Sequence, residues 1–150
     1  MAQFLLITTL LTIAGLIATS IAGFLASPGH VAQHIFFALG TVVLGLFSQS
    51  MTMFFFIGTG KQLKEATNQN PEVVQQTRAF KMRVSPASMY AMVLLMILFI
   101  TGGGVAGGKT PHWLHLTLAI VTILVYAWAY WIEIQAMEKN ARLMDKFLSE

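Results

Sequence analysis

Four long apolar stretches dominate this chain of 150 residues. A helix needs about 20 apolar residues, at a rise of about 1.5 Å per residue, to cross the hydrocarbon core of a bilayer. The third stretch reaches that length only if its helix continues into the glycines that follow it. We therefore expect four transmembrane helices, which span residues 4–25, 31–57, 87–106 and 112–132.

The composition excludes most other classes of protein. Hydrophobic residues make up 56% of the chain and charged residues only 10%, so a soluble enzyme of this size could not bury its apolar surface. A disordered chain is excluded as well, because disorder requires low hydrophobicity and many charges. The lack of cysteine excludes disulfides, iron–sulfur clusters and covalently attached c-type haem. The net charge of +3 is too small to indicate a nucleic acid partner. We predict an all-α integral membrane protein with a single membrane domain.

The basic residues are distributed unevenly along the chain. Five of the nine lysines and arginines lie in the connecting segment 58–86 and three in the tail 133–150, which leaves only Lys109 elsewhere. Cytoplasmic segments of membrane proteins carry an excess of lysine and arginine. We therefore expect both termini, the connecting segment and the tail to be cytoplasmic, in a bacterial inner membrane. Neighbouring spans then run antiparallel, in an up-down-up-down bundle.

Three of the expected helix starts pair a hydroxyl residue with proline, at Ser27-Pro28, Ser85-Pro86 and Thr110-Pro111. The hydroxyl caps a free backbone N–H, and a proline in the first turn has no N–H to lose. In the connecting segment, Asn70-Pro71-Glu72 predicts a further start, and hence a short amphipathic cytoplasmic helix between spans two and three. This helix would contact anionic lipid head groups or a partner subunit. Its apolar face would comprise Val73, Val74, Thr77, Phe80 and Val84.

Residues 103–110 match the letters of the nucleotide-binding phosphate loop, GxxxxGK[ST]. That motif requires a strand before the loop and a helix N-terminus with free amides after it. Here a membrane span precedes the match and Pro111 removes one of the amides. We therefore expect no nucleotide binding, and expect the glycines to form a flexible turn.

All four histidines lie at the starts of the second and fourth spans, which the predicted topology places at the outer face of the membrane. His30 and His34 are four residues apart, and His112 and His115 three apart, so each pair shares one helical face. Small and polar residues, which face other helices rather than lipid, extend both faces, so the histidines should point into the bundle. The extended faces comprise Ala38, Thr41, Gly45, Ser48 and Thr52 on the second span and Ala119, Thr122, Tyr126, Ala129 and Glu133 on the fourth.

Inward histidines at one level of a membrane bundle are typical of a cofactor site. The positive helix N-terminus disfavours imidazolium, and neutral imidazole is the form that binds metals. One hypothesis is haem b, with His34 and His115 as axial ligands of the iron and His30 and His112 near the propionates. Gly15, Gly23 and the glycines that end the third span would then leave room for the macrocycle. The alternatives are a copper or zinc site that uses three or four of the histidines directly, and no cofactor at all.

Two further polar residues lie within or beside the predicted spans. Glu133 is either a carboxyl group inside the membrane, which would make it a functional candidate, or a group that reaches water at the interface. Gln49, between Ser48 and Ser50, could bind a quinone carbonyl or form an interhelical hydrogen bond.

The span count and the histidines on two helices resemble, in outline, the four-helix membrane anchors of b-type cytochromes. The sequence shows no nucleophile or acid–base pair arranged for catalysis. We therefore expect an electron-transfer or accessory subunit rather than a stand-alone enzyme, working with other membrane subunits of a redox complex. The alternatives are a cofactor-free structural or assembly subunit and a membrane protein that binds copper or zinc.

Overall fold

The computed structural model describes residues 1–25 and 30–148, and this part of the chain contains helices and turns but no strand. The helices are α1 (Ala2–Phe24), α2 (Val31–Ala66), α3 (Pro71–Ala106) and α4 (His112–Leu148). All four are long and apolar enough to cross a membrane. The prediction of an all-α chain with four helices of membrane-spanning length and composition is confirmed. The predicted start at Ser27-Pro28 lies outside the described residues.

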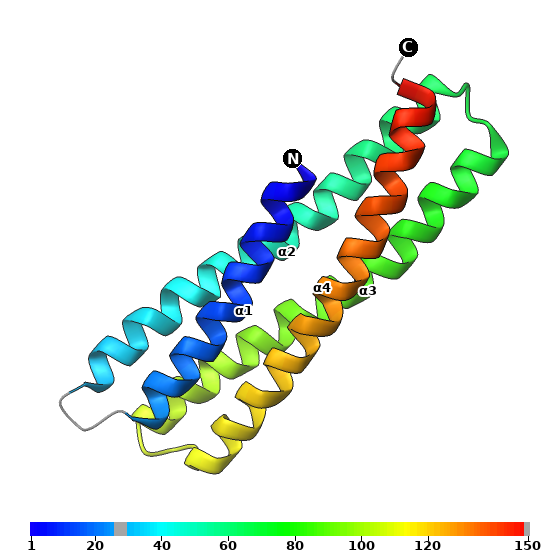
Figure 1. Cartoon of the computed structure of the whole chain (residues 1–150). Helices are drawn as coiled ribbons and strands as arrows, with labels where there is room; N and C mark the ends of the chain where they lie inside the picture. The colour runs from blue at the N-terminus through cyan, green and yellow to red at the C-terminus, as the bar shows by residue number, and fades with distance from the viewer. Residues whose placement is uncertain (26–29, 149–150) are drawn as a thin grey trace.

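The helices lie side by side in an elongated bundle (Figure 1). α1 packs against α2 and α4, α3 packs against the same two helices, and α2 and α4 also meet across the bundle. α1 has 23 residues, whereas the other helices have 36 or 37. The longer helices therefore extend past the N-terminus of α1, and the bundle has a four-helix end and a three-helix end (Figure 1).

The three-helix end differs from the prediction. The segment expected to hold a short separate helix is instead the end of α2, which continues to Ala66, and the first part of α3. The predicted cap is confirmed, because the Oδ1 atom of Asn70 accepts a hydrogen bond of 3.0 Å from the backbone N–H of Glu72. The predicted helix start at Ser85-Pro86 is wrong, since α3 runs through Pro86 without a break.

The packing on both sides of Pro86 explains why the helix continues. A proline inside a helix removes one backbone hydrogen bond and crowds the preceding turn. Val84 and Ala87, which flank it, are fully buried against the other helices, and this burial offsets the cost. Val73 and Thr77 on the predicted apolar face are also buried, so this face packs within the bundle as part of α3.

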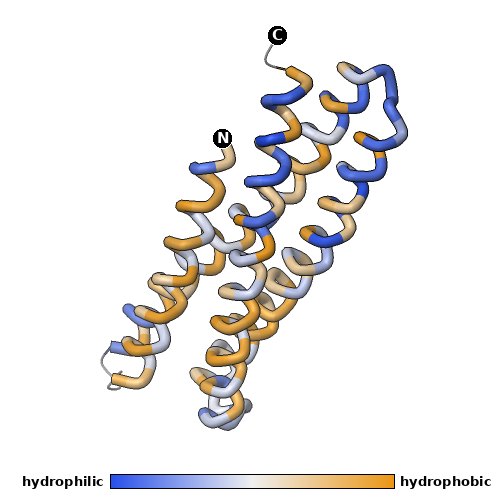
Figure 2. Tube along the Cα trace, turned by 45° about the vertical axis from the view of Figure 1, so that its right-hand side comes forward, coloured by the Kyte–Doolittle hydropathy of each residue, from blue (hydrophilic) through white to orange (hydrophobic). Residues whose placement is uncertain are grey.

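Hydropathy varies both along the length of the bundle and between its outer surface and its interior. Hydrophilic residues gather at the three-helix end, while most of the remaining length is hydrophobic (Figure 2). Large apolar side chains such as Phe36, Phe37 and Leu124 lie on the outer surface. The buried positions include many small polar residues instead: Thr9, Thr12, Ser48, Thr52, Ser88 and Thr122. An apolar exterior around a small, polar interior is typical of helices that face lipid.

Candidate functional sites

The structure brings the four histidines together at the four-helix end. His30 is the N-cap residue of α2 and His112 is the first residue of α4, and both are exposed. His34 and His115 lie about one turn further into their helices and are half-buried. Both His34 and His112 lie within electrostatic range of His115. The two deeper imidazoles, one from α2 and one from α4, therefore lie at the same end of the bundle, close enough to influence each other electrostatically.

Each deeper imidazole packs against a glycine of a neighbouring helix. A Cβ atom at Gly23 in α1 would lie 2.7 Å from Cε1 of His34, and one at Gly102 in α3 would lie 2.9 Å from Cε1 of His115. Both distances are shorter than a van der Waals contact, so any larger residue would force the ring to move. The space beside Gly23 and Gly102 is thus occupied by imidazole rings, whereas the sequence had led us to expect open room there for a macrocycle.

Hydrogen bonding determines which nitrogen of His115 is free to bind a ligand. The hydroxyl of Thr101 donates to the carbonyl oxygen of Leu98 at 2.9 Å, and its Oγ1 lies 3.4 Å from Nδ1 of His115. Because the hydroxyl hydrogen is already committed, Thr101 is placed to accept a hydrogen bond from Nδ1 of His115 in the tautomer that carries its proton there. A neutral imidazole with its proton on Nδ1 has a lone pair on Nε2, which is the arrangement of a metal ligand.

His34 lacks a comparable partner. Its Nδ1 atom is buried and has no hydrogen-bond partner among the described residues. Buried polar atoms usually have a partner, so this nitrogen is a buried polar atom that the described part of the chain leaves unsatisfied. No three or more His, Cys, Asp or Glu side chains within residues 1–25 and 30–148 are grouped so that they could hold a metal ion. The arrangement therefore offers a pair of imidazoles rather than a cage of three or four ligands.

A second polar group surrounds Glu133 in α4. This side chain is 0% exposed, so it does not reach water along the surface of the chain. Its Oε2 atom accepts a hydrogen bond of 3.2 Å from the hydroxyl of Thr9 in α1, and that hydroxyl shares a hydrogen bond of 2.6 Å with Ser48 in α2. The carboxyl group therefore joins three helices in the core.

Several polar atoms near this carboxyl group have no partner. Gln49 is fully buried and lies beside Glu133, but neither atom of its amide forms a hydrogen bond of good geometry. The other carboxyl oxygen, Oε1 of Glu133, also lacks a partner among the described residues. The amide of Gln49 faces the core, whereas a quinone would approach from the lipid side, so the burial favours an interhelical role for Gln49.

The two predicted inward faces are the buried faces of their helices. Thr41, Gly45, Ser48 and Thr52 are buried in α2 and Ala119, Thr122, Tyr126, Ala129 and Glu133 in α4. The hydroxyl of Tyr126 packs against Gly45, where a Cβ atom would lie 2.8 Å from it. This close approach places the largest buried side chain of α4 directly on the backbone of α2.

The structure also reveals residues that contact Glu133 and the imidazoles and that we did not identify from the sequence pattern. Thr9 joins Glu133, Thr101 orients His115, and Gly23 and Gly102 position the imidazoles. The Thr8, Thr9 and Thr12 spacing in the first span was a usable signal, because three hydroxyls at helical spacing indicate an inward face. The glycine contacts had no such signal, since they depend on how neighbouring helices are aligned.

The segment that matches a phosphate loop has the wrong context for one. Its first residues form the last turn of α3, which is a helix rather than a strand. Gly107 is the C-cap residue, and Gly108 adopts a φ of +67°, a left-handed conformation that favours glycine. These glycines therefore end α3 and turn the chain toward α4.

Comparison of this chain with protein-family models, with curated proteins and with solved structures found no match. Its function must therefore be argued from the geometry of the chain itself.

Proposed function

We propose that this chain is a small b-type cytochrome-like membrane subunit that binds haem b through His34 and His115 and transfers electrons within a larger redox complex. One observation carries the proposal: two half-buried imidazoles come from two helices at one end of the bundle, and each packs against a glycine of another helix. Two imidazoles on facing helices are a common axial ligand set for haem in helical bundles.

The donor chemistry of the site fits this cofactor. The hydrogen bond from Nδ1 of His115 to Thr101 leaves Nε2 as the ligand atom. In His34, the buried Nδ1 atom has no hydrogen-bond partner among the described residues, so it would be available to a ligand. Haem bound by two imidazoles would supply a centre that gains and loses one electron without binding a substrate. His30 and His112 are exposed at the same end, where they would interact with the propionates.

The other residues of the chain orient the imidazoles and exclude water. Gly23 and Gly102 allow each ring to approach a neighbouring helix, and Thr101 fixes one tautomer. The exposed apolar side chains along the bundle would face lipid or other membrane subunits. Electron transfer through a bound haem needs neither a nucleophile nor a general base from the chain, so this proposal does not depend on a catalytic residue.

The distribution of basic residues between the two ends of the bundle supports an orientation of the chain in the membrane. Lys61, Lys64 and Arg142 lie near the C-terminal ends of α2 and α4, at the three-helix end, and Lys109 lies between the end of α3 and the start of α4, at the histidine end. By the positive-inside rule, the three-helix end and both termini would be cytoplasmic, in a bacterial inner membrane. The histidines would then lie in the outer half of the bilayer.

A cofactor-free structural or assembly subunit is the second candidate. The observation that favours it is that imidazoles already occupy the space beside Gly23 and Gly102, so histidine packing alone accounts for these two glycines. A copper or zinc protein that uses three or four histidines directly is a weaker proposal, because His30 and His112 are exposed and no three such ligands are grouped among the described residues.

Titration of the purified, haem-free protein with haemin tests the proposal. We expect saturation at one haem per chain, with a Soret band and the split visible bands of a reduced, six-coordinate b-type cytochrome. A protein that gives only the spectrum of haemin in detergent micelles would contradict haem binding. Metal analysis of the same preparation would then distinguish a copper or zinc protein from a cofactor-free subunit.

A further inference from the structure

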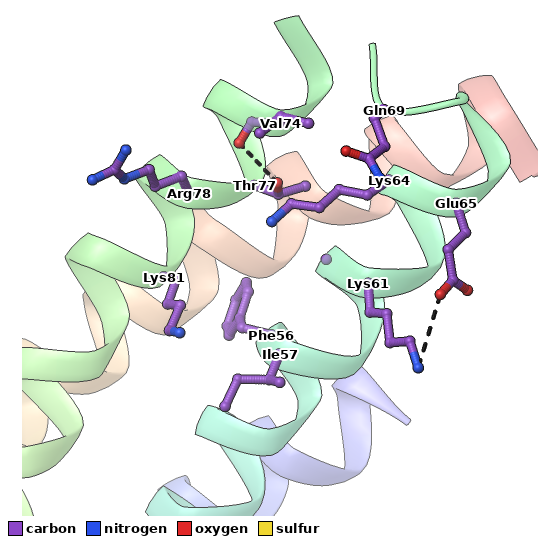
Figure 3. A pocket seen from close by; sticks show the side chains of 11 residues that line it. Phe56, Ile57, Lys61, Lys64, Glu65, Gln69, Val74, Thr77, Arg78 and Lys81 are labelled. Carbon is purple, nitrogen blue, oxygen red and sulfur yellow. Dashed lines mark hydrogen bonds and ion pairs between the residues drawn. The ribbon is translucent and has the colours of Figure 1, made fainter. Parts of the chain in front are cut away.

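A pocket lies between α2 and α3 at the three-helix end (Figure 3), and no histidine lines it. Its volume is about 620 Å³, which lies within the range of small-molecule binding sites, about 300–1,000 Å³. Both helices contribute to its walls, from Phe56 onward in α2 and from Val74 onward in α3. The pocket is therefore formed mainly by two packed helices, and Gln69 in the turn between them completes its lining.

Four basic residues surround this pocket. Lys64 extends from α2 toward α3 and Lys81 lines the α3 side of the pocket, while Arg78 points away and Lys61 turns toward Glu65, 3.8 Å away (Figure 3). The side chains of Lys64, Arg78 and Lys81 form no ion pair or hydrogen bond with another described residue. Cations of one sign around a concave surface concentrate the local potential and attract an anion.

The pocket also has an apolar wall. Phe56 is almost fully buried there, and Ile57 lines the pocket and is partly exposed on the outer surface of the bundle. These two residues end the apolar stretch of α2, and the basic residues begin four positions later. The pocket thus lies where the apolar stretch of α2 gives way to basic residues.

We propose that this pocket binds the phosphate group of an anionic phospholipid, with Lys64 and Lys81 as direct contacts and Arg78 as a third cation at the rim. A free phosphate ion would need the cations but not the apolar wall, whereas a lipid uses both, because its acyl chains continue along the surface beside Ile57. Thr77 contributes no donor, since its hydroxyl already donates to the carbonyl oxygen of Val74 at 3.0 Å. The lysine ammonium groups therefore supply the hydrogen bonds to phosphate.

The experiment measures lipid affinity by native mass spectrometry of the purified full-length chain titrated with phosphatidylglycerol or phosphatidylcholine. The wild-type chain should bind phosphatidylglycerol more tightly. Each lysine is worth roughly a fivefold change in affinity near an anionic head group. The Lys64→Gln/Lys81→Gln variant should therefore bind phosphatidylglycerol roughly 25-fold more weakly, with its affinity for phosphatidylcholine unchanged.

A matched control removes the same charge from the same end of the bundle. Lys139→Gln/Lys146→Gln loses two cations from α4, outside this pocket, and should keep the affinity of the wild type. Glu65→Gln removes an anion that lines the pocket, so this variant should bind the lipid more tightly. Circular dichroism would verify that each variant is folded.

Two results would overturn the proposal. An equal loss of affinity in the α4 control would mean that the attraction is a diffuse effect of the basic end. Inorganic phosphate that displaces the lipid, and whose binding depends on the same two lysines, would identify the ligand as a free anion. The haem titration is a separate measurement, so its failure would leave this proposal in place.

Discussion

The imidazole of His115 occupies the space that a side chain at Gly102 would need, with only 2.9 Å between its Cε1 atom and the position of a Cβ. The adjacent glycine of the same helix, Gly103, has open space around its Cβ position. Two consecutive glycines of α3 therefore differ in whether an imidazole lies beside their Cβ position. Gly102 can serve as the test position and Gly103 as the control.

Substitution of the two glycines by alanine should have opposite effects on stability. Gly103→Ala should stabilise the fold by up to about 1 kcal/mol, because alanine favours a helix over glycine. Gly102→Ala should cost about 1–3 kcal/mol, since the new methyl group displaces His115 from a packed site. Thermal unfolding in one detergent measures both. An equal increase in Tm for the two variants would show that His115 does not pack against Gly102.

Replacement of Thr101 by valine should weaken haem binding without unfolding the chain. The substitution keeps the shape of the side chain but removes the oxygen that accepts from Nδ1 of His115. Loss of such a supporting hydrogen bond typically costs a metal ligand about 10–100-fold in affinity. Thr101→Ser, which keeps the hydroxyl, should bind haem nearly as well as the wild type. Equal haemin affinities for the valine and serine variants would contradict the positioning role of Thr101.

Glu133 should tolerate an amide but not truncation. Glu133→Gln keeps an oxygen that can accept from Thr9, so its free energy of unfolding should lie within about 1 kcal/mol of the wild type. Glu133→Ala leaves the hydroxyl of Thr9 with one partner fewer and opens a cavity, at a cost of about 2–4 kcal/mol. Glu138→Ala, at an exposed residue of the same helix, should change stability by less than about 0.5 kcal/mol. Similar unfolding curves for the two alanine variants would place Glu133 outside the core.

The cap of α3 gives a local test of the three-helix end. Asn70→Ala removes the side-chain oxygen that accepts from the N–H of Glu72, which should destabilise the protein by about 1 kcal/mol. Asn70→Asp keeps an acceptor and should be nearly neutral. Chemical unfolding monitored by circular dichroism measures both variants. A stability loss for aspartate as large as that for alanine would argue against a cap at this residue.

Much of the fold followed from the sequence because bilayer physics leaves little choice. The apolar stretches had to become membrane-length helices, and the histidine pairs had to share an end because they begin two of those helices. The inward faces of α2 and α4 could be predicted because small polar residues recur there at helical spacing. These inferences use only the spacing of residues along one helix.

The remaining features depend on how one helix is aligned with another. Pro86 was expected to begin a helix, but the burial of Val84 and Ala87 makes it an interior residue of α3. The contact of Thr9 with Glu133 joins residues 124 positions apart, and no local pattern indicates it. The approach of Lys64 and Lys81 to one pocket likewise depends on the alignment of α2 with α3 (Figure 3).

The most direct test of the central claim is the visible spectrum of the protein purified from haem-supplied cells, compared among three alanine variants. His34→Ala and His115→Ala should each lose the Soret band of the six-coordinate cytochrome, because each removes one proposed axial ligand. His112→Ala, which removes an exposed histidine of the same helix end, should keep that band. A Soret band that is unchanged in His34→Ala and in His115→Ala would contradict haem ligation by this pair.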